Sequence, residues 1–210
     1  MPRFAQMILA GMQQKGHDVS VWSPKAVFFK MAFKKPFLEK WLGYLDQYLV
    51  FPVVIKLRLQ NCSKGTLFVF ADNALGPWVP LVSHRLHVVH CHDFLAQQSA
   101  FGILPENKTG MTGKYYQKFI RWGYRKADNF ICISKKTQTD LHLLLTKTLK
   151  MSEVVYNGLN QNFEPATNKT ELREALSNRY GIDLSMGYIL HIGGNVFYKN
   201  KLGVFEIYDK

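Results

Sequence analysis

Apolar residues near the start of the chain recur at the spacing of a helix. The stripe consists of Phe4, Met7, Ile8, Gly11 and Met12. It predicts an amphipathic helix over residues 3–15, and Gly16 follows where a helix ends most easily in a left-handed conformation. The alternation of residues 19–22 then predicts a strand, which Ser23 and Pro24 end.

Short apolar runs bounded by turn residues continue along the chain. They predict further strands at 67–71, 86–91, 129–133, 153–156 and 188–192. Helices are predicted between them, in a long segment after Pro36, at 112–126, 135–148 and 170–179, and from Lys201 onward. Pro52 should kink or end the long helix after Pro36. Ser134 is the predicted N-cap of the helix at 135–148. This alternation predicts an α/β fold with a parallel sheet and flanking helices.

A polar stretch from Asn160 to Lys169 divides this pattern. We therefore expect a first Rossmann-like domain over residues 1–160, a linker and helix over 161–185, and the start of a second Rossmann-like domain over 186–210. In a doubly wound fold a strand and a phosphate-facing loop precede the first helix. We expect that first strand to be missing here and the second domain to be incomplete.

Charge and cysteine content narrow the classes of partner and compartment. Lys and Arg number 27 against 15 Asp and Glu, and the net charge of +12 favours polyanionic partners. Zinc-finger, basic-zipper and RNA-binding signatures are absent, which argues against specific nucleic-acid binding. Cys62, Cys91 and Cys132 are widely spaced, as expected of free thiols in a reducing compartment. No secretory signal or membrane span stands out, so we expect a cytoplasmic protein.

Residues 25–61 are both basic and aromatic. Such a segment suits an anionic membrane surface, on which the protein would lie peripherally. A buried helix with a solvated basic loop explains the pattern equally well.

The carboxyl ends of parallel strands are where such sheets bind ligands. The run at 86–91 leads into His92 and Asp93, and the run at 67–71 leads into Asp72. A histidine there can donate a hydrogen bond to a hydroxyl, although a pair that merely terminates a strand is an equal alternative. His90 and His92 also lie on one strand face, but a metal needs three or four ligands and no others are evident, so no metal is expected.

A second candidate site follows the run at 188–192. Gly193 and Gly194 precede Asn195 and Lys199. A glycine turn before a helix exposes backbone N–H groups to an anion, and a lysine adds the charge that a diphosphate needs. An ordinary turn is the alternative.

Five segments, in order, resemble glycosyltransferase family 4, whose members have the GT-B fold of two Rossmann-like domains. They are LAGMQQKGHDVSVWSP, VVHCHDFLA, ICISKKTQTDL, VVYNGLNQNFEP and YILHIGGNVFYKNKLGV. The resemblance implies transfer of a sugar from a nucleotide-sugar donor to an acceptor hydroxyl with retention of configuration. The acceptor would be a sugar, a polysaccharide or a lipid-linked molecule.

The resemblance also implies a role for each matching residue. His92 would touch the transferred sugar or stabilise the transition state, and Asp72 and Asp93 would shape the acceptor side. The donor diphosphate would bind Gly193, Gly194 and Lys199, with the nucleotide-sugar as co-substrate and no cofactor.

Two departures from the family pattern limit what we expect of this chain. Family members usually have an arginine shortly after the second-domain glycine, whereas Gly194 and Asn195 stand in that region here. The Glu-x7-Glu region, which binds the nucleotide-sugar in the family, is missing. We therefore expect residues 1–210 alone to be inactive. The alternatives are a non-catalytic sugar- or nucleotide-binding or regulatory module of the same fold, and a nucleotide-sugar epimerase.

Overall fold

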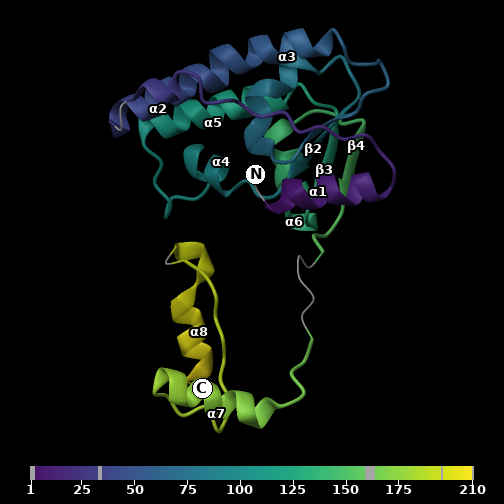
Figure 1. Cartoon of the computed structure of the whole chain (residues 1–210). Helices are drawn as coiled ribbons and strands as arrows, with labels where there is room; N and C mark the ends of the chain where they lie inside the picture. The colour runs from purple at the N-terminus through teal and green to yellow at the C-terminus, as the bar shows by residue number, and fades with distance from the viewer. Residues whose placement is uncertain (1–2, 33–34, 159–163, 195, 210) are drawn as a thin grey trace. The chain divides into compact units, whose positions relative to one another are not determined.

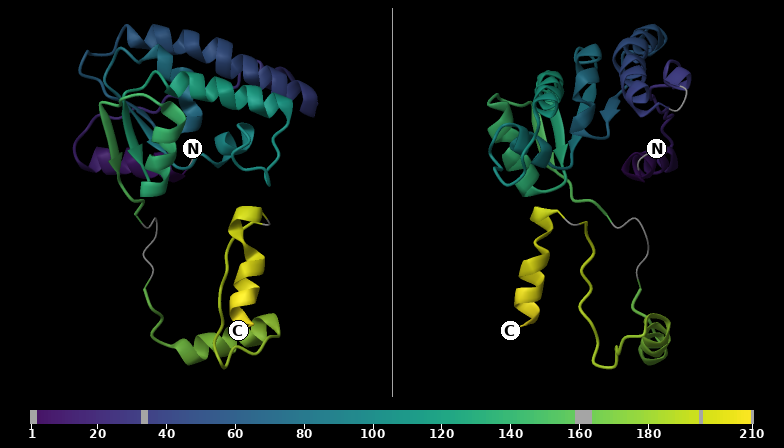
Figure 2. Two further views of the ribbon diagram at one scale, coloured as in Figure 1. Left: turned by 180° about the vertical axis from the view of Figure 1, so that it is seen from behind. Right: turned by 90° about the vertical axis from the view of Figure 1, so that its left-hand side faces the viewer.

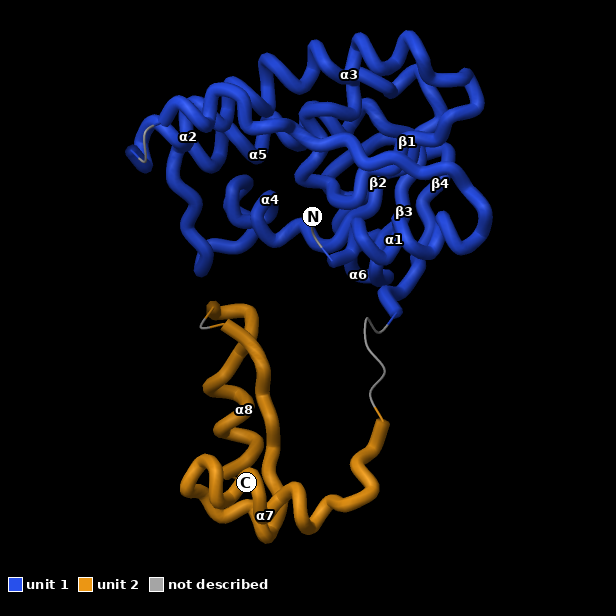
Figure 3. The backbone as a smooth tube through the Cα atoms, viewed as in Figure 1, with its two compact units in different colours: residues 1–158 blue, residues 159–210 orange. Residues whose placement is uncertain are grey.

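The computed structural model describes residues 3–32, 35–158, 164–194 and 196–209 (Figure 1). It divides into two compact units, residues 1–158 and 159–210, which Figure 3 colours separately.

Unit 1 is built on a parallel sheet. Its strands are β1 (Phe68–Phe70), β2 (His87–Cys91), β3 (Asn129–Cys132) and β4 (Met151–Val154), in the order β1-β2-β3-β4. Every neighbouring pair is parallel, which confirms the α/β prediction with flanking helices. Val89 on β2 and Phe130 on β3 are fully buried register partners at the centre of the sheet.

Two predicted strands are wrong. Residues 19–22 are irregular in the structure, and burial does not follow their alternation, since Val19 and Trp22 are half-buried while Ser20 and Val21 are exposed. The Trp22 ring lies edge-on to Phe68, with the centroids 5.7 Å apart, and Arg58 lies over its face at 5.4 Å. Residues 188–192 are also irregular, because the described part of unit 2 contains no strand with which they could pair.

The first helix, α1 (Arg3–Gln14), ends as predicted, since Gly16 has a φ of +82°. The long predicted helix is a rod of three consecutive segments, α2 (Pro36–Leu45), a π-helical turn η2 (Asp46–Val50) and α3 (Phe51–Leu59). Pro52 does not end this rod, although the π turn directly before it interrupts the α-helical pattern. Pro52 lies in the first turn of α3, where the π turn has already reset the hydrogen bonding, so its missing N–H is tolerated.

A buried carboxylate ties the rod to the preceding segment. Asp46 accepts hydrogen bonds from the backbone N–H groups of Val27, Phe28 and Phe29, at 2.9–3.0 Å. Burial raises the pKa of Asp46, but these three bonds outweigh it and hold the pKa below its ordinary value. The short helix η1 (Phe29–Ala32) is thereby fixed beside the rod.

The remaining helices complete both units. They are η3 (Asn73–Leu81), α4 (Leu95–Ala100), α5 (Met111–Tyr124) and α6 (Lys135–Leu145) in unit 1, and α7 (Lys169–Tyr180), η4 (Phe197–Lys199) and α8 (Lys201–Tyr208) in unit 2. Ser134 caps α6 as predicted, because its hydroxyl accepts the N–H of Thr137 at 3.1 Å. The rod runs along one edge of unit 1 in all views (Figures 1 and 2).

Candidate functional site

His92 lies directly after β2, at the carboxyl end of the sheet. Its Nε2 is 2.9 Å from the carbonyl oxygen of Ala71, the residue that follows β1. The ring of Phe4 on α1 meets the imidazole edge-on, with the centroids 4.4 Å apart. The His92 carbonyl accepts the hydroxyl of Thr137 on α6 at 3.1 Å. Contacts to three separate segments therefore fix this residue: two hold its half-buried side chain, and the third holds its backbone.

The contact with Ala71 limits the chemistry of His92. A carbonyl oxygen only accepts, so Nε2 must carry the hydrogen of this bond. In the neutral ring Nδ1 then holds a lone pair and can accept hydrogen from a hydroxyl. Once protonated, the ring presents Nδ1–H as a donor for negative charge.

His90 lies two residues earlier, next to the same phenylalanine. Its ring is edge-on to Phe4, at 5.1 Å between centroids. Burial, helped by the charge of His92, lowers the pKa of His90 to about 4, so this ring is neutral at physiological pH. Among the described residues no group of three or more His, Cys, Asp or Glu side chains is arranged to hold a metal ion, so nothing there extends the His90–His92 pair.

Asp72 and Asp93 occupy equivalent turns after neighbouring strands. Asp72 accepts the N–H of Ala74 at 2.8 Å and opens η3, while Asp93 accepts the N–H of Leu95 at 3.1 Å and opens α4. Both carboxylates therefore already shape the loops at the carboxyl ends of β1 and β2. The structure thus brings Asp72, His92 and Asp93 to the same edge of the sheet, as expected for parallel strands.

The residues predicted to bind phosphate all lie in unit 2. A Cβ atom built on Gly193 would lie 3.3 Å from Cδ of Lys199, so the lysine stem passes over this glycine. Gly194 faces open space, and the Nζ of Lys199 lies 5.5 Å from the centre of the Tyr198 ring. The structure therefore joins Gly193 and Lys199. Asn195 lies outside the described residues.

Sequence reasoning missed two contacts of His92. Phe4 was predicted to lie on the apolar stripe of the first helix, but nothing in the sequence pairs it with His92. Thr137 lies three residues after the Ser134 cap, and its bond to the His92 carbonyl depends on the alignment of β2 with β3. Both contacts join residues far apart in sequence.

Two shallow hollows on unit 1 lie away from these residues. One is at the opposite edge of the sheet, where His87 begins β2 and Asn129 begins β3. The other is lined by two aromatic and five basic residues, Phe101, Trp122, Lys118, Arg121, Arg125, Lys126 and Lys147. In the second hollow Arg121 donates to the carbonyl of Leu144, and Lys147 donates to the carbonyl of Ala127. These two cations thus have structural partners.

All three cysteines are free, as predicted, and Cys91 and Cys132 are buried register partners on β2 and β3. None of the helices in the described ranges combines the length and apolar character that crossing a bilayer requires.

Comparison with protein families identifies the family that the chain resembles. The family model of Glycosyltransferase Family 4 matches residues 1–163. This range includes all four strands of unit 1 and the three residues at their carboxyl ends. A search of curated proteins finds no match.

Proposed function

The chain belongs to glycosyltransferase family 4, and from this premise we propose that it serves the transfer of a sugar from a nucleotide-sugar donor to an acceptor hydroxyl, with retention of configuration. The observation that carries the proposal is the family match over residues 1–163, which includes His92 and the whole parallel sheet. The position of His92 at the carboxyl end of that sheet supports it, because ligands of such sheets bind there.

We assign His92 to the reacting sugar. With Nε2 donating to Ala71, Nδ1 is the atom that meets a sugar hydroxyl or, when protonated, the charge that develops in the transition state. Asp72 and Asp93 shape the acceptor side through the loops that they open.

Lys199, Gly193 and Gly194 bind the donor diphosphate. The contact between the Lys199 stem and Gly193 supports this assignment, because it places the lysine stem beside the glycine turn. The lysine supplies the positive charge that the leaving diphosphate requires. On this proposal the reaction uses no metal and no cofactor besides the nucleotide-sugar.

The proposed acceptor is a sugar, a polysaccharide or a lipid-linked molecule, and the proposed location is the cytoplasmic face of a membrane. The net charge of +12 supports contact with anionic lipids, and three free thiols suit a reducing compartment.

We further propose that residues 1–210 by themselves transfer little sugar. The described part of unit 2 consists of two α-helices, a short 3-10 turn and irregular segments, with no strand. The sugar and the base of the donor therefore have no sheet edge in this part on which to bind. The same observation favours the second candidate, a non-catalytic binding module of this fold.

The test uses the full-length product of the gene that encodes these residues. Labelled UDP- and GDP-sugars are supplied with a membrane extract, and the product linkage is determined by NMR. The proposal predicts transfer to an extract component, with the anomeric configuration of the donor preserved. Inverted linkages would contradict retention, conversion of the donor without an acceptor would indicate an epimerase, and donor binding without turnover would indicate a non-catalytic module.

A further inference from the structure

Exposed apolar side chains recur every four residues along the rod formed by α2, η2 and α3. Each is between 41% and 72% exposed. The six residues, here called the rod stripe, are Phe37, Trp41, Leu45, Leu49, Val53 and Leu57. A soluble monomer usually scatters such side chains singly, whereas a contiguous series of them marks an interaction surface.

The π turn limits how far the rod stripe winds around the rod. In an α-helix a spacing of four residues advances each side chain by about 40° around the axis, so a long stripe would wind away. The π turn η2 is wider, and it offsets part of this rotation in the middle of the rod. The rod stripe therefore extends along most of the rod, about 35 Å for residues 36–59.

The opposite side of the rod is firmly held. Phe51 and Ile55 are 5% exposed and pack in one cluster with Val82. The indole N–H of Trp78 donates to the carbonyl of Gln47 at 3.0 Å, and the hydroxyl of Tyr48 is 2.8 Å from that of Tyr116 on α5. The rod stripe is therefore exposed because the rest of the rod is already committed to unit 1.

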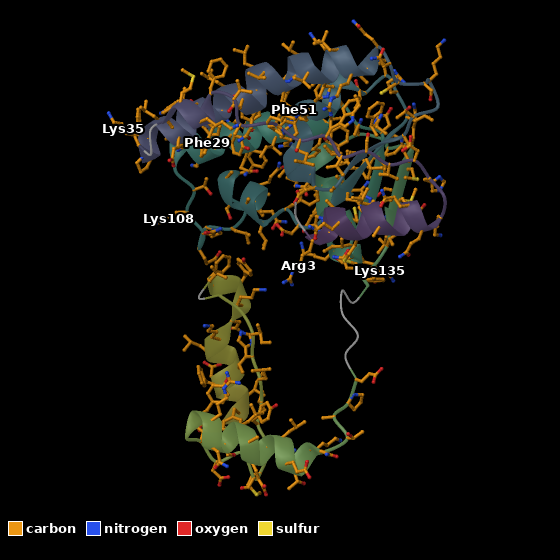
Figure 4. All side chains as sticks on the ribbon, in the orientation of Figure 1. Arg3, Phe29, Lys35, Phe51, Lys108 and Lys135 are labelled. Atoms are coloured by element: carbon orange, nitrogen blue, oxygen red, sulfur yellow. The ribbon has the colours of Figure 1, made fainter. Side chains whose placement is uncertain are left out.

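The charges beside the rod stripe are mainly positive. Lys35, Lys40 and Lys56 are exposed along the rod, whereas Glu39 is half-buried and Asp46 is buried. Lys35 marks the start of the rod in Figure 4. Long lysine stems can lie along an apolar surface while the ammonium groups reach phosphate, and a tryptophan prefers the boundary between apolar and polar layers.

We propose that the rod stripe lies in the interfacial region of an anionic lipid bilayer, with the rod parallel to the membrane plane. An apolar face bordered by lysines is the pattern of helices that lie in this way. The exposed lysines favour an anionic bilayer over a second copy of this chain, because two copies would bring their positively charged borders together. The inference specifies the surface behind the peripheral location proposed above, and it does not depend on sugar transfer.

Vesicle sedimentation with residues 1–210 tests the inference. Vesicles contain phosphatidylcholine alone or with phosphatidylglycerol. We expect binding to the anionic vesicles, and we expect the substitutions Leu49→Glu and Leu57→Glu each to weaken it about tenfold or more, because each removes a buried leucine from the interface. Leu143→Glu is the matched control, since Leu143 is 70% exposed on α6, and it should bind like the wild type.

Circular dichroism melting checks that both rod variants fold, and light scattering gives their mass. Equal vesicle binding by the wild type and both folded rod variants would overturn the inference, as would a wild type that binds no vesicles. A wild-type dimer that Leu49→Glu converts to a monomer would assign the surface to a second copy instead. The vesicle assay contains no nucleotide-sugar, so its outcome does not depend on whether the proposed transfer activity is correct.

Discussion

Gly123 on α5 lies against Gly76 on η3, and a single methyl group at this crossing should destabilise unit 1. A Cβ atom on Gly123 would lie 2.0 Å from the carbonyl oxygen of Gly76, 2.3 Å from its carbon and 2.8 Å from the nitrogen of Pro77. All three are backbone atoms, so no side-chain rotation relieves the overlap. In Gly123→Ala the two segments must separate by roughly 1 Å or more, in an interior packed as densely as a crystal.

The energetic effect follows from what the crossing supports. Ile120 and Tyr124 on α5 and Val79 on η3 belong to the main core of unit 1, and the hydroxyl of Tyr124 donates to Gln97 at 2.5 Å. Overpacking of a core costs about 1–3 kcal/mol and sometimes more, and a weakened buried hydrogen bond adds about 1 kcal/mol. Alanine recovers about 1 kcal/mol through its helix propensity. The last two contributions roughly cancel, so the expected net loss is about 1–3 kcal/mol.

Urea unfolding of the wild type, Gly123→Ala and Gly113→Ala measures this difference. Gly113 lies on the same helix, but its Cβ would meet only a side-chain methyl of Thr109, at 2.7 Å, which can rotate away. Gly113→Ala should therefore change the free energy of unfolding by less than about 1 kcal/mol. If Gly123→Ala proves as stable as Gly113→Ala, the tight crossing of α5 and η3 is wrong.

Two further predictions concern pH and the donor. Because the pKa of His90 is about 4 in the folded chain and about 6.5 when unfolded, the unfolded state binds the proton first as pH falls. After allowance for solvent screening, the free energy of unfolding measured in urea should therefore fall by about 1–2 kcal/mol between pH 6.5 and 4. His90→Asn should remove that part of the pH dependence. If the pH profile of His90→Asn equals that of the wild type, the burial of a neutral His90 ring is refuted. In the full-length product Lys199→Ala should raise the KM for the nucleotide-sugar about tenfold, because a charge-assisted contact is lost. The control Lys201→Ala should leave this KM nearly unchanged. If both variants change the KM equally, Lys199 does not belong to the diphosphate site.

The parallel sheet could be predicted because its central strands carry continuous apolar runs. Every residue of β2 and β3 is buried or half-buried, and the Ser134 cap follows directly from residue type. Residues 19–22 alternate as a strand often does, yet they are irregular in the structure, where Trp22 packs on Phe68. β4 starts at Met151, two residues before the predicted run, because Met151 and Lys150 both donate to the Asp128 carbonyl.

The candidate site was predictable only in its position. The end of an apolar run placed His92 at the carboxyl edge of the sheet, and the structure confirms that placement. The bond from its Nε2 to Ala71 depends on the pairing of β1 with β2, and the Phe4 contact depends on where α1 packs. Neither dependence is local, so neither is visible in the sequence. The chemical roles of His92, Asp72 and Asp93 stay predictions.

The rate of sugar transfer by His92 variants tests the central claim most directly. In the full-length product, His92→Ala and His92→Gln should each lower turnover by about 10²–10⁴, the scale of general acid–base and electrostatic contributions. The glutamine amide can still donate to the Ala71 carbonyl, so His92→Gln separates the loss of Nδ1 from the loss of structure. His84→Ala is the control, because His84 is exposed at the opposite edge of the sheet. Wild-type turnover in both folded His92 variants would contradict sugar transfer at this site.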